Sequence, residues 1–245
     1  MELRFIEETS LKAWPALEQE FYDGWILRFS KGYSKRSNSV NALYLSTLDV
    51  SKKVEYCEKA YMERDLPPIF RVTPFFSPHN LDQFLDNRGY KRIDPTWVLT
   101  LELAHHPISP NPKVEIQPLN LDEWIEIFCR FREEGIEKHL THIEILKSIP
   151  TPKLFAGLLS ESEFVACGVG TIIERNFGLF DLITNPAQRR RGYGTDLVMR
   201  MLSWAKEKEA QLAFLQVVER NDPALNLYKK LGFQKTYPYW YRIKK

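Results

Sequence analysis

Apolar residues in the C-terminal half of the chain recur at two spacings. In residues 121–132, Trp124, Ile125 and Phe128 share one face at helical spacing, and a second helix is expected over about 137–149. Shorter apolar runs bounded by polar turns predict strands. These expected strands cover residues 114–116, 153–159, 164–173 and 177–184.

A glycine-containing turn follows the last of these strands. Residues 189–195 read Arg-Arg-Arg-Gly-Tyr-Gly-Thr and lead into another amphipathic run. This run places Leu197, Val198, Met201, Leu202 and Ala205 on one helical face. A strand at 211–218, a helix at 223–231 and a closing strand at 237–243 complete the pattern. The order of elements predicts an α/β fold.

The turn at 189–195 has the chemistry of an anion site. The first backbone N–H groups of a helix lack intrahelical partners and carry partial positive charge, so a phosphate can bind there. Gly192 and Gly194 lack a Cβ, which lets the backbone adopt unusual φ/ψ angles and approach a ligand closely. The alternative is an ordinary strand-to-helix turn with solvated arginines, since a short glycine pattern has many chance matches.

Two motifs together resemble those of the GNAT acyltransferases. Arg189, Gly192 and Gly194 fit the acetyl-CoA motif of that family, Arg/Gln-x-x-Gly-x-Gly/Ala. A second segment resembles the family signature Asn-x-x-Ala-x-x-x-Tyr-x-x-x-Gly-Phe. It is made by Asn221, Ala224, Tyr228, Gly232 and Phe233. The resemblance covers roughly residues 115–245 and implies the GNAT fold, in which helices flank a mixed, mostly antiparallel central sheet.

The resemblance also implies roles for individual residues. Backbone groups of 191–195 would hold the diphosphate of acetyl-CoA, and free main-chain groups of 182–184 would pair with its pantetheine. Tyr228 would be catalytic, because a phenol stays protonated near neutral pH and can donate to the leaving thiolate. The expected donor-binding residues are Leu182, Ile183, Thr184, Arg189, Arg190, Arg191, Gly192, Tyr193, Gly194, Thr195, Asn221, Ala224 and Tyr228. The alternatives are an ordinary strand residue for Thr184, a helix cap for Asn221 and helix packing for Tyr228.

Neither motif identifies a general base. Many relatives carry a glutamate early on the strand before the turn, where this chain has Gly178, which has no side chain to take a proton. Asp181 lies on the same strand, but strict alternation would put it on the opposite face. Glu137, Glu174, Glu219 and a base reached through ordered water all stay open.

The N-terminal half carries an echo of the same order. A hairpin-like pair and a helix come first, and a strand, a helix, a glycine and an aromatic residue then parallel the second motif. The expected elements are 25–29, 39–45, 51–64, 70–73, 80–90 and 97–103. Residues 41–50 contain no glycine where a donor-binding turn would stand, so this half resembles a degenerate GNAT-like half that binds no acetyl-CoA.

The segment 105–112 is the predicted linker, because its prolines hold it extended and remove ladder hydrogen bonds. The predicted domains are therefore a degenerate GNAT-like domain over 1–108 and an acetyl-CoA-binding GNAT domain over 113–245.

Composition limits the classes of partner. The 245 residues include 34 Lys and Arg against 32 Asp and Glu, and the net charge of +2 gives no chain-wide basis for binding nucleic acid or an anionic membrane. No apolar run approaches the roughly 20 residues that span a bilayer, and the N-terminus lacks a signal-peptide core. A soluble, cytoplasmic protein is expected.

Cysteines and histidines do not suggest a metal site. The three cysteines, Cys57, Cys129 and Cys167, are scattered in apolar patterns and are expected to be buried free thiols. The histidines with close neighbours are His105, His106, His139 and His142. No cysteine or carboxylate cluster accompanies them at ligand spacing, so no metal is expected.

The leading functional hypothesis is an acetyl-CoA-dependent N-acetyltransferase that acts on the primary amine of a small molecule or amino-acid-like acceptor. A non-catalytic acyl-CoA-binding or sensing module is the alternative from another class. An aminoacyl-tRNA-dependent transferase is a third interpretation, against which the intact acetyl-CoA motif and the modest net charge argue. Whether the chain is a monomer or a homodimer stays open.

Overall fold

The computed structural model describes residues 3–104 and 106–244, so His105 of the predicted linker lies outside the described residues. The chain forms two compact units. The first unit comprises Met1–Val98, Val218–Arg220 and Thr236–Lys245, and the second comprises Leu99–Val217 and Asn221–Lys235.

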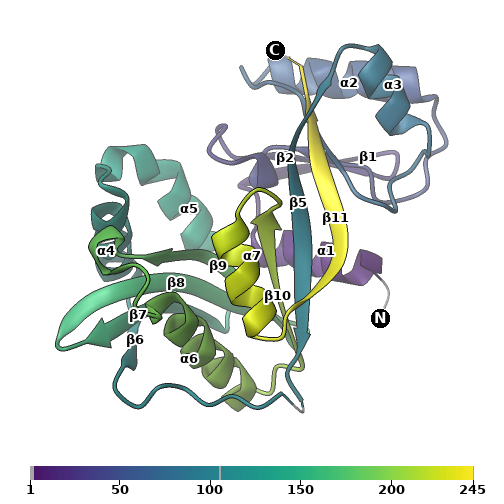
Figure 1. Cartoon of the computed structure of the whole chain (residues 1–245). Coiled ribbons are helices and arrows are strands. Elements are labelled where there is room, and N and C mark those ends of the chain that lie inside the picture. Colours follow the sequence, from purple (N-terminus) through teal and green to yellow (C-terminus); the bar gives the residue numbers. More distant parts are fainter. Residues whose placement is uncertain (1–2, 105, 245) are drawn as a thin grey trace. The chain divides into compact units, whose positions relative to one another are not determined.

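The first unit packs two helices against one face of a sheet. Its helices are α1 (Leu3–Ala13), α2 (Val50–Met62) and α3 (Leu81–Asn87), and its strands are β1 (Glu18–Tyr22), β2 (Trp25–Phe29), β3 (Val40–Asn41), β4 (Ile69–Val72) and the greater part of β5 (Lys91–Glu102) and of β11 (Gln234–Ile243) (Figure 1). The strands follow the order β1-β2-β3-β4-β11-β5. Trp25, Leu27 and Phe29 point to the α2 and α3 side and form the buried core there. Strand β3 pairs with β4 in parallel, and β1 with β2 antiparallel.

The second unit has helices on both faces of its strands. Its elements are β6 (Glu115–Leu119), α4 (Leu121–Arg132), a 3₁₀ turn (Ile136–His139), α5 (Leu140–Ser148), β7 (Lys153–Ser160), β8 (Glu163–Ile173), β9 (Asn176–Thr184), a 3₁₀ turn (Pro186–Gln188), α6 (Tyr193–Glu207), β10 (Leu212–Val218) and α7 (Asp222–Lys230). The strand order is β10-β9-β8-β7-β6, antiparallel except for the β9 and β10 pair. Figure 1 shows α4 and α5 on one face and α6 on the other. The predicted fold class, a mostly antiparallel sheet flanked by helices, is confirmed.

Most expected elements are observed within a few residues, and the exceptions have local causes. The strand expected at 39–45 is reduced to Val40–Asn41, because the chain turns at once and the N–H of Leu43 bonds to the carbonyl of Asn41. Helix α1 and strand β1 were not expected. Helix α1 buries the polar residues Glu7, Thr9 and Ser10, which weakens its apolar periodicity.

The closing strand β11 belongs to the first unit, although it follows α7 along the chain. It pairs antiparallel with β4 from Trp240 opposite Val72 to Ile243 opposite Ile69. Its Tyr237 hydroxyl donates to the buried carboxylate of Glu7 at 2.6 Å. This division differs from the predicted ranges 1–108 and 113–245, because the edge of β4 is completed by a strand distant in sequence. The predicted domain ranges stay a prediction.

Candidate functional site

The turn between β9 and α6 exposes a row of hydrogen-bond donors. Gly192 is the N-cap of α6 and has φ 90°, in the left-handed region that favours glycine. Among the described residues, the backbone N–H groups of 191–194 have no acceptor. The side chains of Arg189, Arg190 and Arg191 are exposed, and none forms an ion pair with a described residue. Donors and positive charge therefore lie together where the sequence predicts an anion site.

Gly194 is the point where the turn, the end of β9 and helix α7 come together. A Cβ added to Gly194 would lie 3.2 Å from Cδ1 of Leu227 and 3.3 Å from Oγ1 of Thr184. By contrast, a Cβ on Gly192 would meet nothing within 4 Å. Gly192 is therefore required for its backbone conformation, and Gly194 for the close approach of three elements.

Strands β9 and β10 pair only over their first residues. The parallel register runs from Leu212 opposite Asn176 to Phe214 opposite Gly178. Within the described residues the two strands do not pair beyond Gly178, although β9 continues to Thr184. The edge of β9 at 182–184 that faces β10 therefore has main-chain groups available to an extended ligand.

The expected residues of α7 lie at its start and in its middle. The Asn221 side chain accepts from the N–H of Ala224 at 3.3 Å, so Asn221 is a helix cap. Tyr228 is half-buried, and its ring makes an edge contact with Phe233 at 5.8 Å between centroids. Among the described residues its hydroxyl has no hydrogen-bond partner. Burial raises the pKa of Tyr228 to about 12, so the phenol stays protonated at neutral pH.

Gly178 has no room for a glutamate, the residue that the family resemblance would place at this position. A Cβ at this position would lie 2.7 Å from ring atoms of both Phe180 and Phe214. Its partner in the sheet is Thr171, whose hydroxyl bonds to the carbonyl of Pro150, just after α5. Gly178 therefore faces the α4 and α5 side of the sheet.

The expectation that Asp181 faces away from this side is wrong, because β9 contains a bulge. Ile183 pairs with Cys167 and Phe180 pairs with Val169, so two residues of β9 oppose the single residue Gly168. Asp181 sits in the bulge with φ 48°. Its carboxylate Oδ2 lies 2.8 Å from Nε2 of His142 on α5. Sequence periodicity carries no signal for this bulge, and the two residues lie far apart in the chain.

The other carboxylates considered as bases lie elsewhere. Glu174 is in the turn between β8 and β9, at the opposite end of β9 from Thr184. At about 3.3 Å per residue, the strand separates the two by more than 25 Å. Glu137 is exposed on the 3₁₀ turn before α5. Glu219 belongs to the first unit and accepts from the indole N–H of Trp97 at 3.2 Å.

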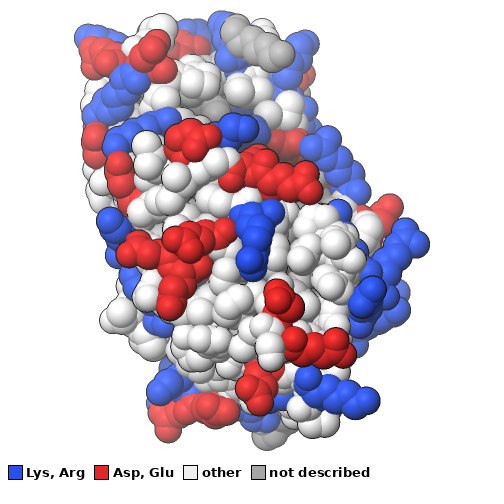
Figure 2. Space-filling model, turned by 90° about the vertical axis from the view of Figure 1, so that its left-hand side faces the viewer, with Lys and Arg blue, Asp and Glu red and all other residues white. Residues whose placement is uncertain are grey.

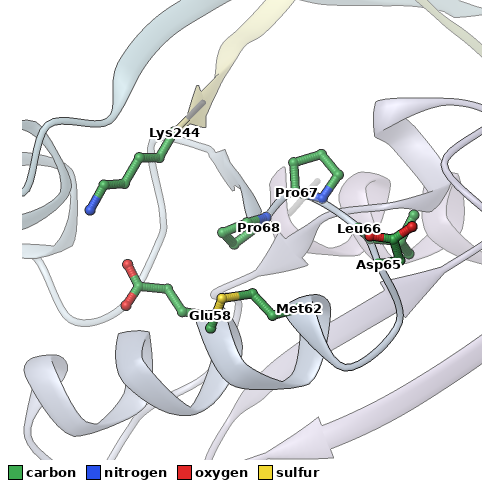
Figure 3. A pocket seen from close by; sticks show the side chains of 7 residues that line it. All are labelled: Glu58, Met62, Asp65, Leu66, Pro67, Pro68 and Lys244. Atoms are coloured by element: carbon green, nitrogen blue, oxygen red, sulfur yellow. The ribbon is translucent and has the colours of Figure 1, made fainter.

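The first unit has its own hollow, of about 620 Å³, beside α2 (Figure 3). Its lining comprises Glu58, Met62, Asp65, Leu66, Pro67, Pro68 and Lys244. The Glu58 carboxylate accepts from Arg88 at 2.8 Å and from the hydroxyl of Tyr90 at 3.0 Å, and its hydrogen bonds with Arg88 lower its pKa. Glu58 is thus committed to structural contacts, and the hollow lacks the donor row of the β9 to α6 turn.

Cys57, Cys129 and Cys167 are buried free thiols, as predicted. In the described part of the chain, no three or more His, Cys, Asp or Glu side chains are grouped so that they could hold a metal ion. Within residues 3–104 and 106–244, no helix combines the length and apolar character needed to cross a membrane. Figure 2 shows acidic and basic side chains interspersed on one face.

Comparisons with known proteins find similarity to acetyltransferases. The family model described as "Probable histone acetyltransferase Rv0428c C-terminal" matches residues 1–242. Uncharacterized N-acetyltransferase YobR of Bacillus subtilis (strain 168) is 28% identical over 251 aligned residues, covering 100% of this chain and 99% of that protein. A GCN5-related N-acetyltransferase from Kribbella flavida has a TM-score of 0.74 at 15% identity, covering 98% of this chain and 95% of the other. A tandem GNAT protein from the clavulanic acid biosynthesis pathway has a TM-score of 0.60 at 14% identity, covering 79% and 69%.

Proposed function

The chain belongs to the Rv0428c C-terminal acetyltransferase family and is an N-acetyltransferase of the GNAT superfamily, and on this premise we propose that its donor substrate is acetyl-CoA. The acceptor in this proposal is the primary amine of a small molecule or an amino-acid-like compound. The observation that carries the proposal is the open donor row at 191–194, beside three exposed arginines.

The β9 to α6 turn fits the diphosphate of acetyl-CoA. Backbone N–H groups at a helix start bind phosphate oxygens, and the exposed Arg189, Arg190 and Arg191 add charge-assisted attraction. Gly192 allows the left-handed turn that directs these N–H groups outward, and Gly194 leaves room beside Thr184. We expect acetyl-CoA or CoA to bind with a Kd in the micromolar to submillimolar range.

The free edge of β9 fits the pantetheine arm. Residues 182–184 continue β9 beyond its last residue pair with β10. Their main-chain N–H and C=O groups on the edge facing β10 are therefore available for hydrogen bonds to a ligand. An extended chain with amide groups satisfies such an edge as an added strand does. The thioester would then follow β9 toward the bulge.

Tyr228 supplies the proton for the leaving sulfur in this proposal. Acetyl-CoA provides an activated thioester, and transfer to an amine releases a thiolate. The phenol has no partner among the described residues and its pKa is raised to about 12, so it carries its proton at neutral pH. A group poised in this way stabilises the negative charge only as that charge forms on sulfur.

Two measurements test the proposal. Calorimetry with CoA should give one binding site per chain, because residues 41–50 of the first unit contain neither the glycines nor the arginines of the β9 to α6 turn. A thiol-release screen with acetyl-CoA against panels of amines, amino acids and peptides should then identify the acceptor class. Absence of heat and of a thermal shift with millimolar CoA would refute acetyl-CoA as the donor. Tight CoA binding with no thiol release from any panel would instead favour a sensing role.

A further inference from the structure

The β9 bulge brings a carboxylate to the face on which Gly178 leaves none. Phe180 faces the same side as Gly178, since its ring would meet a Cβ placed there. The next residue, Asp181, points to this side as well, toward His142 of α5. Leu182 points to the opposite face, where its Cδ2 would lie 2.6 Å from a Cβ at Gly168. The extra residue in the bulge therefore turns Asp181 toward α4 and α5, two residues before Ile183.

His142 is built into the core as a support for this carboxylate. It is fully buried, and its ring contacts Trp124, Phe128 and His139 at centroid distances of 6.1, 5.3 and 5.8 Å. An ionised carboxylate has only acceptor oxygens, so His142 Nε2 must carry the hydrogen in the 2.8 Å contact with Asp181 Oδ2. The His142 ring, held within this aromatic cluster, thus fixes the position of Asp181 Oδ2 by a hydrogen bond.

The other oxygen of Asp181 remains accessible. The Asp181 side chain is 24% exposed, whereas His142 is 1% exposed. Oδ1 has no hydrogen-bond partner among the described residues. Asp181 has φ 48°, a left-handed backbone conformation that aspartate adopts more readily than most residues and that fits its place in the bulge.

We propose that Asp181, positioned by His142, binds the ammonium form of the acceptor and later receives the excess proton that the nitrogen carries once it has bonded to the acetyl carbon. This inference rests on the proposed function and assigns the acceptor class as aliphatic amines that are cationic at neutral pH. Asp181 is then a catalytic residue, and His142 is a positioning residue that acts through it. The Asp181 carboxylate would thus take the role of the glutamate that the family resemblance places at position 178, from a position three residues later in the chain.

The proton and electron balance is complete with the groups present. An ammonium paired with Asp181 first loses one proton to solvent and becomes the neutral amine. The amine nitrogen forms a bond to the acetyl carbon, and the bond from that carbon to sulfur breaks with its electron pair on sulfur. The nitrogen passes its excess proton to Asp181, and the sulfur takes a proton from Tyr228. Solvent then removes the proton from Asp181 and restores the proton on Tyr228.

The first test compares Asp181→Asn with the wild type, using propylamine as acceptor probe and thiol release as readout. Asparagine keeps the shape and the acceptor oxygen toward His142 but loses the charge. We expect kcat/KM for propylamine to fall about 100-fold, while the Kd for CoA changes less than twofold. For aniline, which is neutral at pH 7, the fall in kcat/KM caused by Asp181→Asn should be smaller than for propylamine, because aniline has no ammonium charge for Asp181 to bind. Asp122→Asn, an exposed carboxylate on α4, is the matched control and should behave as wild type.

The second test separates positioning from packing at His142. His142→Gln keeps a side-chain N–H donor toward Asp181, whereas His142→Phe removes the donor and suits the aromatic cluster. We expect kcat/KM of the glutamine variant to stay within about fivefold of the wild-type value, and kcat/KM of the phenylalanine variant to fall about 20-fold or more. Thermal stability should follow the reverse order, because burying an apolar ring in this cluster is more favourable than burying an amide. If activity follows stability, His142 only packs and the inference is overturned.

The remaining outcomes distinguish this inference from the proposed function. If wild-type protein binds CoA but neither turns over propylamine nor binds it in the presence of CoA, the acceptor inference fails and the donor proposal stands. If Asp181→Asn acts on propylamine at the wild-type rate, or loses CoA binding in parallel with turnover, the role of Asp181 is refuted. If CoA itself does not bind, the proposed function fails first, and the inference fails with it.

Discussion

Each unit contains a pair of parallel strands connected by a helix, β3-α2-β4 in the first unit and β9-α6-β10 in the second. The two units differ in whether the backbone N–H groups of the turn before that helix have acceptors. In the second unit, the turn from β9 to α6 leaves its N–H groups open beside three arginines. In the first unit, the corresponding connection from β3 to α2 is closed by the chain's own carboxylate, Asp23. The first unit therefore has a similar order of strand, turn and helix without the open N–H groups.

Asp23 occupies the donors that an anion would otherwise use. Its carboxylate accepts from the N–H of Thr47 at 3.0 Å and from that of Leu48 at 2.9 Å. The buried Lys53 lies 3.1 Å away and pairs with it. These hydrogen bonds, with the Leu48 N–H foremost, hold the pKa of Asp23 well below its ordinary value. The start of α2 is further capped by Asp49, which accepts from Ser51 at 2.8 Å.

Helices α3 and α7, one in each unit, differ in the residue at one matching position. Counted back from the left-handed glycines Gly89 and Gly232, Leu85 of α3 stands where α7 has Tyr228. Leu85 is fully buried, whereas α7 buries none of its residues completely. The first unit thus uses this position for its core, and the second keeps a phenol there. A shared order of elements does not by itself predict a shared chemistry.

The largest expected effect is on CoA binding, when the open turn before α6 is altered. Gly192→Asp places a negative charge and a Cβ in the donor row, and should raise the Kd for CoA at least about 100-fold in calorimetry. Gly89→Asp is a matched control, because Gly89 has φ 88° and, like Gly192, open space around its Cβ position. Both variants should lose about 1 kcal/mol of stability from the left-handed backbone. Equal loss of CoA binding in both would show that strain, not the site, is responsible.

The next effect concerns the phenol that α3 lacks. Tyr228→Phe keeps the ring contact with Phe233 and removes the hydroxyl, so kcat should fall about 100-fold while the Kd for CoA stays within twofold. Single-turnover thiol release on an acceptor from the screen measures the chemical step. Wild-type turnover by the phenylalanine variant would leave Tyr228 with a packing role only.

Much of the second unit could be predicted because its sequence signals are local. The helix at 121–132 was predicted to its observed ends from the apolar face of Trp124, Ile125 and Phe128, and in the structure a capping box of Asn120 and Glu123 stabilises its start. The β9 bulge could not be predicted, because strand periodicity assumes strict alternation and Asp181 breaks it through one residue in a left-handed conformation.

The first unit was harder to predict because its signals are distant in sequence. Strand β11 pairs with β4 across more than 160 residues, and α1 conceals a buried Glu7 that pairs with Arg71. Likewise, the residue that closes the β3 to α2 turn, Asp23, lies well before that turn in the chain. The absence of glycine at 41–50 predicts a turn unlike that of the second unit, but no local pattern predicts that Asp23 accepts from the N–H groups of this turn.

A smaller effect tests whether Asp23 is structural. Asp23→Asn should lower the midpoint of thermal unfolding at pH 7 by several degrees, because Lys53 then lacks its ionic partner, and should leave CoA stoichiometry at one per chain. The folded pKa of Asp23 is depressed from 3.8, so its stabilisation is present above about pH 4 and is lost as pH falls through the folded pKa. Unfolding midpoints of the variant and wild type should therefore converge as the pH is lowered below 4. A second CoA site in the variant would show that the carboxylate alone keeps this turn from binding the donor.

The smallest expected effect compares the starts of α7 and α3. Asn221 caps α7 through Ala224, whereas the N-cap of α3, Asn80, makes no side-chain cap bond. Asn221→Ala should therefore cost about 1 kcal/mol in chemical denaturation and Asn80→Ala almost nothing. Asn221→Ser keeps a capping oxygen and most of the stability but removes the amide donor that the family resemblance directs at acetyl-CoA. Both Asn221 variants should weaken CoA binding about threefold, the size of one modest hydrogen bond. If the serine variant binds CoA as the wild type does, capping is the whole role of Asn221.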